Sequence, residues 1–273
     1  MKSQKEKCEI FRALHQRDGA FIIPNPWNIG TARLLAATGF EALATTSIGY
    51  AFSIGRQDHG VSRDEMIAHV TEMCAATDLP ISADLENGFG EDPGTVAETI
   101  RMAAAAGLAG CSIEDSSNDD SNPIYGIQRS AERVRAAADV VRGLPFPFML
   151  TARAENYFNG RRDLKDTIKR LQAFQEAGAD VLYAPGITDM AEITTLVKSV
   201  DRPVNVVAGL QGLHFNLSDL SKAGVKRVSI GGALTRVALA AVLNAAREMR
   251  DHGTFEFVNG PITSREISQL LDA

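Results

Sequence analysis

Acidic side chains follow two apolar segments in the first half of the sequence. Asp84 and Glu86 stand within Ser82–Gly90 (SADLENGFG), and Glu114 ends the next apolar segment. Residues two apart on a strand point to the same side, so the carboxylates of Asp84 and Glu86 are expected to lie together. Buried carboxylates repel each other unless they share a divalent cation, and an all-oxygen ligand set favours Mg²⁺ or Mn²⁺ over Zn²⁺. The sequence therefore predicts a metal site, with Asp58 beside it.

Two simpler roles for strand-end acids stay open, namely capping of the next helix and pairing with an arginine. Alternation along the strand puts Asp115 on the opposite side from Glu114, so Asp115 is expected to pair with a helix residue. Gly88 and Gly90 are expected to let the backbone turn sharply and to leave room for a ligand.

The expected strand ends lack the reactive groups of two other classes of aldolase. No lysine ends a strand, which disfavours a Schiff-base aldolase, and no histidine does, which disfavours a zinc aldolase. His59 and His214 fall in expected loops and are assigned structural roles.

The elements that carry these residues alternate between short β-like and longer helical segments. Four phrases, AATGFEALA, AAAGLAGCS, EAGADVLYA and KAGVKRVSI, end a helix at Gly and start a strand within a few residues. This repeat favours a (β/α)8 barrel, whose active site lies at the carboxyl ends of the strands. A doubly wound sheet is the alternative, but no GxGxxG follows the first strand. The expected strands are 21–26, 42–47, 81–86, 110–115, 148–155, 180–185, 204–209 and 227–231.

We expect one barrel domain over residues 1–273, with an extra helix at about 6–16 and a helical tail at about 235–273. The net charge of −6 and the absence of a Lys/Arg cluster argue against nucleic acid. The three cysteines form no CxxC motif, the first residues are too polar for a signal peptide, and no apolar run approaches the ~20 residues of a membrane span. A cytoplasmic protein without a membrane partner is expected.

Several motifs in their order along the chain resemble the isocitrate lyase/phosphoenolpyruvate mutase superfamily. They are Thr-Ser before GRQD, then DLENGFG, IED and TARAE. The resemblance implies a (β/α)8 barrel that binds Mg²⁺ and a 2-oxo acid. It makes Asp84 the direct metal ligand, and Asp58, Glu86 and Glu114 ligands that act largely through water. It also implies that Arg153 contacts the substrate.

The carboxylate-binding turn of the family falls at Thr45, Thr46 and Ser47, which departs from its Ser-Gly sequence. The backbone N–H groups of this turn could still bind a substrate carboxylate. The lyases of the family that cleave isocitrate or methylisocitrate carry a Cys-Gly-His loop after strand 4. Here that region reads EDSSNDDSNPIYG, so the chain resembles a subgroup without the catalytic cysteine, and (methyl)isocitrate is disfavoured as the substrate.

The segment Ser116–Gly126 replaces that loop and is rich in Ser, Asn and Asp. We expect it to close over the bound ligand, with Asn118 and Asn122 contacting the substrate. A permanently ordered surface loop is the alternative.

The expected function is a Mg²⁺-dependent lyase that cleaves a C–C bond of a 2-oxo carboxylic acid, by decarboxylation of an oxaloacetate-like acid or by a retro-aldol step. A metal-stabilised enolate would form, Arg153 and Asp58 would take part in catalysis, and pyruvate or a homologue would be released. Phosphonopyruvate-type P–C chemistry is the first alternative, with Arg161 and Arg162 as phosphonate contacts or as plain loop charges. A non-catalytic barrel that binds 2-oxo acids is the second.

The last long helix, over Thr235–Arg250, has apolar residues around much of its circumference. A helix of this kind is usually buried on more than one side, so a homo-oligomer is expected. The family resemblance implies that this helix is exchanged between subunits, in dimers that pair into tetramers. A helix packed only on its own barrel is the alternative.

Overall fold

The structure is a computed structural model that describes residues 1–117, 119, 121–210, 215–260 and 262–272. Eight parallel strands form one sheet in the order β1-β8-β7-β6-β5-β4-β3-β2. The strands are β1 (Phe21–Ile23), β2 (Leu43–Ala44), β3 (Ile81–Asp84), β4 (Gly110–Glu114), β5 (Met149–Arg153), β6 (Val181–Tyr183), β7 (Val204–Val207) and β8 (Arg227–Ser229). The Ala44 amide donates to the Pro24 carbonyl at 3.0 Å, which joins β2 to the end of β1. The predicted (β/α)8 barrel is confirmed, and the open doubly wound sheet is excluded.

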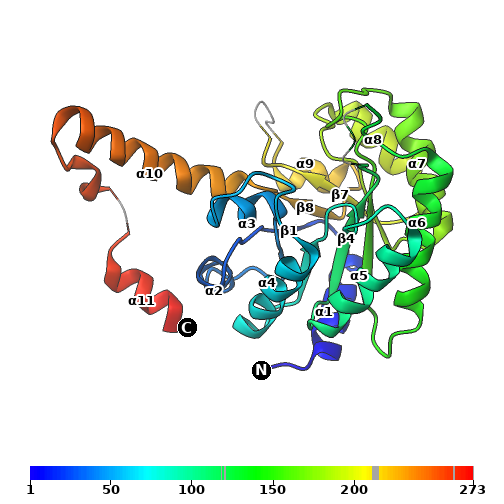
Figure 1. The fold of residues 1–273 in the computed structure, drawn as a ribbon, viewed down its shortest axis with the longest axis horizontal. Coiled ribbons are helices and arrows are strands. Elements are labelled where there is room, and N and C mark those ends of the chain that lie inside the picture. The colour runs from blue at the N-terminus through cyan, green and yellow to red at the C-terminus, as the bar shows by residue number, and fades with distance from the viewer. Residues whose placement is uncertain (118, 120, 211–214, 261, 273) are drawn as a thin grey trace.

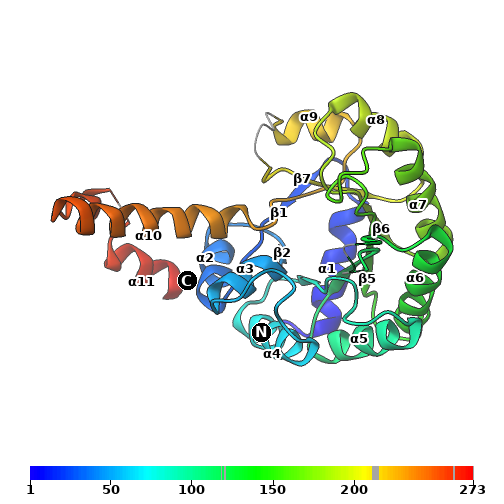
Figure 2. The same cartoon turned by 45° about the horizontal axis from the view of Figure 1, so that its top comes forward.

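Helices surround this sheet, and α4 to α9 form a ring outside the strands (Figure 2). Local sequence signals start two of these helices: Ser62 and Glu65 form a capping box, and Asp92 caps the helix that starts at Pro93. The helices are α1 (Gln4–Gln16), α2 (Ile29–Ala37), α3 (Ser47–Ser53), α4 (Arg63–Ala76), α5 (Pro93–Ala105), α6 (Ile127–Arg142), α7 (Leu164–Ala177), α8 (Met190–Lys198), α9 (Leu217–Lys222), α10 (Ala233–His252), the 3₁₀ helix η1 (Glu256–Asn259) and α11 (Ser264–Asp272).

All eight strands end earlier than the sequence predicts, and two of these differences change the site. The strand expected over 42–47 stops at Ala44, because Thr46 accepts a hydrogen bond from the Gly49 amide and starts α3. The strand expected over 81–86 stops at Asp84, and Glu86 has a φ of 48° in a turn. The expectation that Asp84 and Glu86 point to the same side through strand alternation is therefore wrong.

The first helix closes the amino end of the barrel. The apolar side of α1, with Cys8, Phe11 and Leu14, packs against Phe21 and Met149 at the starts of the strands. Lys7 donates to the carbonyls of Cys74 and Thr77 at the carboxyl end of α4, so its buried charge is solvated by peptide groups. The barrel interior is thus sealed below and can be hollow only toward the carboxyl ends of the strands.

The last long helix leaves the barrel. In Figures 1 and 2, α10 projects away from the ring of helices, and α11 returns toward α2. Only Thr235 of α10 is buried, so within one chain the expected burial of this helix on several sides is not found. Its large exposed apolar side chains are Val237, Leu239, Val242, Leu243 and Met249. None of the described helices is both long enough and apolar enough to span a membrane.

A buried ion pair ties β4 to α7. The carboxylate of Asp115 accepts from Arg170 at 2.9 Å, and both side chains are almost fully buried. Asp115 therefore faces away from the barrel interior and pairs with a helix residue, as its place in the sequence predicts.

Replacing Arg170 by Met should destabilise the fold by about 3 kcal/mol, because it leaves the Asp115 carboxylate buried without its partner. Urea unfolding measures this free energy. Arg101→Met is the matched control, since Arg101 pairs with Glu98 at the surface and its loss should cost about 1 kcal/mol or less. Equal losses in the two variants would contradict the prediction.

Candidate active site at the carboxyl ends of the strands

A cavity of about 430 Å³ opens at the carboxyl ends of the barrel strands. Such a volume lies in the range of small-molecule sites. Most of the side chains predicted from the sequence line it: Thr45, Thr46, Ser47, Asp58, Asp84, Glu114 and Arg153. The strands thus bring together residues that are up to 108 positions apart in the sequence, counted from Thr45 to Arg153.

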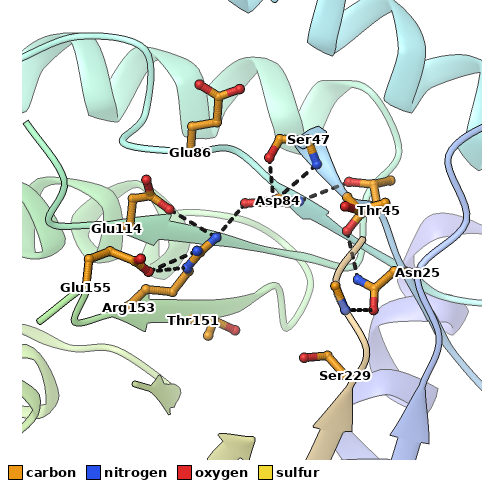
Figure 3. A network of polar contacts seen from close by, with 12 residues as sticks. Asn25, Thr45, Ser47, Asp84, Glu86, Glu114, Thr151, Arg153, Glu155 and Ser229 are labelled. Atoms are coloured by element: carbon orange, nitrogen blue, oxygen red, sulfur yellow. Dashed lines mark hydrogen bonds and ion pairs between the residues drawn. The ribbon is translucent and has the colours of Figure 1, made fainter. Parts of the chain in front are cut away.

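The guanidinium of Arg153 stands at the centre of the acidic residues (Figure 3). It contacts Asp84 at 2.9 Å, Glu114 at 3.0 Å and Glu155 at 2.9 Å. Glu114 and Arg153 are adjacent across the β4–β5 pairing, so the sheet register places them side by side. The guanidinium of Arg153 therefore contacts three carboxylates in the wall of the cavity.

The turn after β2 holds Asp84 in place. The Ser47 hydroxyl and amide donate to the Asp84 carboxylate at 2.8 Å and 3.2 Å, and the Asp84 amide donates to the Thr45 hydroxyl at 3.0 Å. Thr46 caps α3. Thr45, Thr46 and Ser47 all line the cavity. Their contact with a substrate carboxylate stays a prediction, whereas the contacts of Ser47 and Thr45 with Asp84 are observed.

Burial raises the pKa of several acidic side chains around Arg153. Burial raises the pKa of Glu114 well above its usual value, although Arg153 opposes this shift. Burial also raises the pKa of Glu155, of Glu86 and of Asp58. A cation that joined this cluster would favour the ionised forms, so metal binding and proton release should be coupled.

Two observations bear on the predicted metal. Glu86 is buried and is absent from the cavity lining, and its Oε1 atom has no hydrogen-bond partner among the described residues. Among the residues that the structure describes, no three Asp, Glu, His or Cys side chains are arranged to bind one ion directly. The oxygen donors suit Mg²⁺ chemically, and a Mg²⁺ ion held directly by Asp84 and, through water, by Asp58, Glu86 and Glu114 stays a prediction.

Of the two asparagines predicted to contact the substrate, only Asn122 can be placed, and it does not line the cavity, although Ser116 at the start of the loop does. Asn122 is exposed and is absent from the cavity lining, while Asn118 lies outside the described residues. The ends of the loop are fixed, because Ser116 and Ile124 form a β-bridge and Ile124 and Tyr125 are buried. Closure of this loop over a ligand, with a catalytic contact from Asn122, stays a prediction.

Sequence reasoning missed several residues that line the cavity. His59, assigned a structural role, reaches it and contacts Glu86 through Nδ1 at 3.2 Å. Glu155, at the end of the segment expected to be the fifth strand, also lines the cavity. Asn205, Arg227 and Ser229 line it as well, and their alternate positions along the last two strands are the signal that could have identified them.

His59 should be charged and His69 neutral at pH 7 in the metal-free protein. The hydrogen bond to Glu86 and the charge of Asp58 raise the pKa of His59 to about 9, while burial lowers that of His69 to about 4. The stabilisation from charging His59 is complete below about pH 6.5 and is lost as the pH rises through about 9. Side-chain ¹⁵N NMR titration measures both, and Glu86→Gln should move only the His59 titration downward. A His59 titration near 6.5 in the unaltered protein would refute this assignment.

Comparisons with known proteins agree with the motifs. The profile of the phosphoenolpyruvate phosphomutase family matches residues 11–250. A 2-methylisocitrate lyase of Escherichia coli K12 is 28% identical over 204 residues, which cover 72% of this chain and 68% of the relative. An uncharacterised protein of Mycobacterium tuberculosis H37Rv is 31% identical over 246 residues, covering 88% of this chain and 89% of the relative.

A solved structure from Burkholderia cenocepacia J2315, provisionally named a lyase/mutase, superposes with a TM-score of 0.96 at 60% identity. The alignment covers 99% of this chain and 97% of that protein. Both the family profile and this superposition extend over nearly the whole barrel. The chain therefore belongs to the phosphoenolpyruvate phosphomutase family, within the isocitrate lyase/phosphoenolpyruvate mutase superfamily that its motifs indicate.

Proposed function

We propose that this protein is a Mg²⁺-dependent lyase that cleaves a C–C bond of a 2-oxo carboxylic acid and releases pyruvate or a homologue. The observation that carries the proposal is the contact of Arg153 with Asp84 and Glu114 inside the cavity. The family membership supports it, since the E. coli relative is named a lyase. When bound, Mg²⁺ would neutralise the carboxylates and polarise the keto oxygen of the substrate.

The residues of the chain would have separate tasks. Ser47 and Thr45 hold Asp84 in its orientation, so the metal ligand is positioned before the metal binds. Arg153, kept in place by Glu155, would stabilise the negative charge that develops on the keto oxygen when the C–C bond breaks. The depth of the cavity would keep water from that charge.

Turnover should require a divalent metal. Purified protein with Mg²⁺ is screened against 2-oxo mono- and dicarboxylates, and pyruvate release is followed. EDTA should abolish activity, and Mg²⁺ or Mn²⁺ should restore it, because the cluster offers only oxygen ligands. Calorimetry in buffers of different ionisation enthalpy should show proton release when Mg²⁺ binds. Full activity without metal would refute the metal's role.

Asp84→Ala should lower kcat/KM by a factor of about 10³ or more, because it removes the direct metal ligand. Asp139→Ala is the matched control, since Asp139 is an exposed acid on the outer helix α6. Circular dichroism checks that both variants are folded. An Asp84 variant as active as the control would show that the ion binds elsewhere.

Cleavage or formation of a P–C bond is the alternative reaction. The family profile supports this alternative, because it describes a phosphomutase. Arg161 and Arg162 are exposed and lie outside the cavity lining, so they offer a phosphonate no cationic contact there. Adding phosphonopyruvate to the screen, with detection of phosphate, separates the two reactions. Binding of 2-oxo acids without any turnover would indicate the non-catalytic barrel instead.

We further propose that a second copy of the chain covers α10, giving a homodimer that can pair into a tetramer. The support is the row of exposed apolar side chains on α10 and on the segment that follows it, where Phe255 and Val258 are also exposed. The barrel of one chain leaves this surface open (Figure 1).

Sedimentation should therefore give a mass of at least twice the 29.3 kDa of one chain at micromolar concentration. Val242→Glu should shift the protein toward monomer, because it places a charge in the apolar surface of α10. Lys169→Glu, an exposed change on the barrel helix α7, is the control and should leave the mass unchanged. A monomer of the unaltered protein would refute the oligomer.

A further inference from the structure

The barrel interior beneath the acidic cluster is polar. (β/α)8 barrels usually fill this space with branched apolar side chains. Here the cavity lining also includes polar groups on five strands, namely Ser82, Ser112, Tyr183, Asn205, Arg227 and Ser229, beside apolar ones such as Ile23 and Val207. In Figure 3, Ser229 and Thr151 lie lower in the view than Asp84 and Arg153. We call Asn205, Arg227 and Ser229 the floor, because Arg227 is the first residue of β8 and contacts His15 of α1, the helix that closes the amino end of the barrel.

The cation of this floor has no anionic partner. Arg227 is 5% exposed, and its guanidinium contacts only neutral groups: Asn205 at 2.9 Å, Thr151 at 3.0 Å and the His15 ring at 3.5 Å. Within the described part of the chain no carboxylate forms an ion pair with it, whereas Arg153 has three. Burial lowers the pKa of His15 to about 3, so the His15 ring is neutral and adds no charge. A buried cation without a counter-ion is costly unless an anion joins it.

Arg227 also fixes the orientation of the neighbouring amide. A guanidinium only donates, so the oxygen of Asn205 must face Arg227 and its NH₂ group must face away. That NH₂ donates to the Ser229 hydroxyl at 3.0 Å, and the Ser229 hydroxyl also interacts with the Tyr183 side chain. The floor therefore presents N–H and O–H groups beside a positive charge, and such groups can bind an oxyanion.

We propose that Arg227 determines the substrate specificity of this cavity: with Asn205 and Ser229, it binds a second anionic group of the substrate. The inference rests on the proposed function, in which the 2-oxo acid end of the substrate lies at the metal. The carboxylates at the mouth repel any anionic group that the metal does not hold, so the second one is directed to the floor. A carboxylate and a phosphonate share the required chemistry.

The test compares ligands that differ only at the far end. With Mg²⁺ present, calorimetric titration gives Kd for oxalate, 2-oxobutyrate, oxaloacetate and phosphonopyruvate, and KM replaces Kd for any compound that is turned over. The protein should bind at least one of the last two about tenfold or more tightly than 2-oxobutyrate, whose far end is an uncharged methyl group. The tighter of the two identifies the anionic group as carboxylate or phosphonate.

Arg227→Met should remove the roughly tenfold preference for a second anionic group. The Kd of oxalate should stay unchanged, because oxalate occupies only the metal end of the cavity. Ser229→Ala, which keeps the charge, should weaken only the ligands with a second anionic group, by a few-fold. Equal weakening of all ligands, oxalate included, in Arg227→Met would make Arg227 a structural residue and overturn the proposal.

The unaltered protein alone can also decide the matter if Arg227→Met does not fold. Mg²⁺-dependent oxalate binding without any preference for a second anionic group would overturn this inference and leave the proposed function standing. Absence of Mg²⁺-dependent oxalate binding would instead overturn the proposed function.

Discussion

The crowding of carboxylates around one guanidinium is the constraint on which the rest of the site depends. Asp84, Glu114 and Glu155 can share a buried space only because Arg153 lies between them. The parallel register of β4 and β5 sets this arrangement, and the turn after β2 completes it by donating to Asp84. The same crowding keeps the site short of positive charge, which is why it is suited to a divalent cation and an anionic substrate together.

The sequence predicted the fold well because its signals are local. The capping box at Ser62 and the Asp92-Pro93 start need only a few neighbouring residues, and both start helices in the structure. The end of β2 was misplaced because Thr46 continues the strand pattern but caps a helix instead. Glu86 was misoriented because strand alternation was extended into a turn, and φ at Glu86 depends on the packing of that turn rather than on residue type.

The interior of the barrel was the least predictable region. Asn205 and Arg227 occupy interior-facing positions of their strands. A sequence pattern does not tell whether an isolated polar residue faces the interior or the surrounding helices. Their pairing is a contact between neighbouring strands, set by the alignment of Asn205 with Arg227. The result is a barrel with an acidic mouth and a basic floor, so its two arginines have opposite surroundings.

The helix that seals the barrel has a consequence for the order in which the chain can assemble. α1 is synthesised before every strand of the barrel, yet the apolar residues packed with it include Ala109, Met149 and Val181. These partners leave the ribosome about 100 to 170 residues after it, so α1 cannot bury its whole apolar face until most of the barrel has been made. During that interval the apolar face with Phe11 and Leu14 lacks these partners, so a chaperone could bind it.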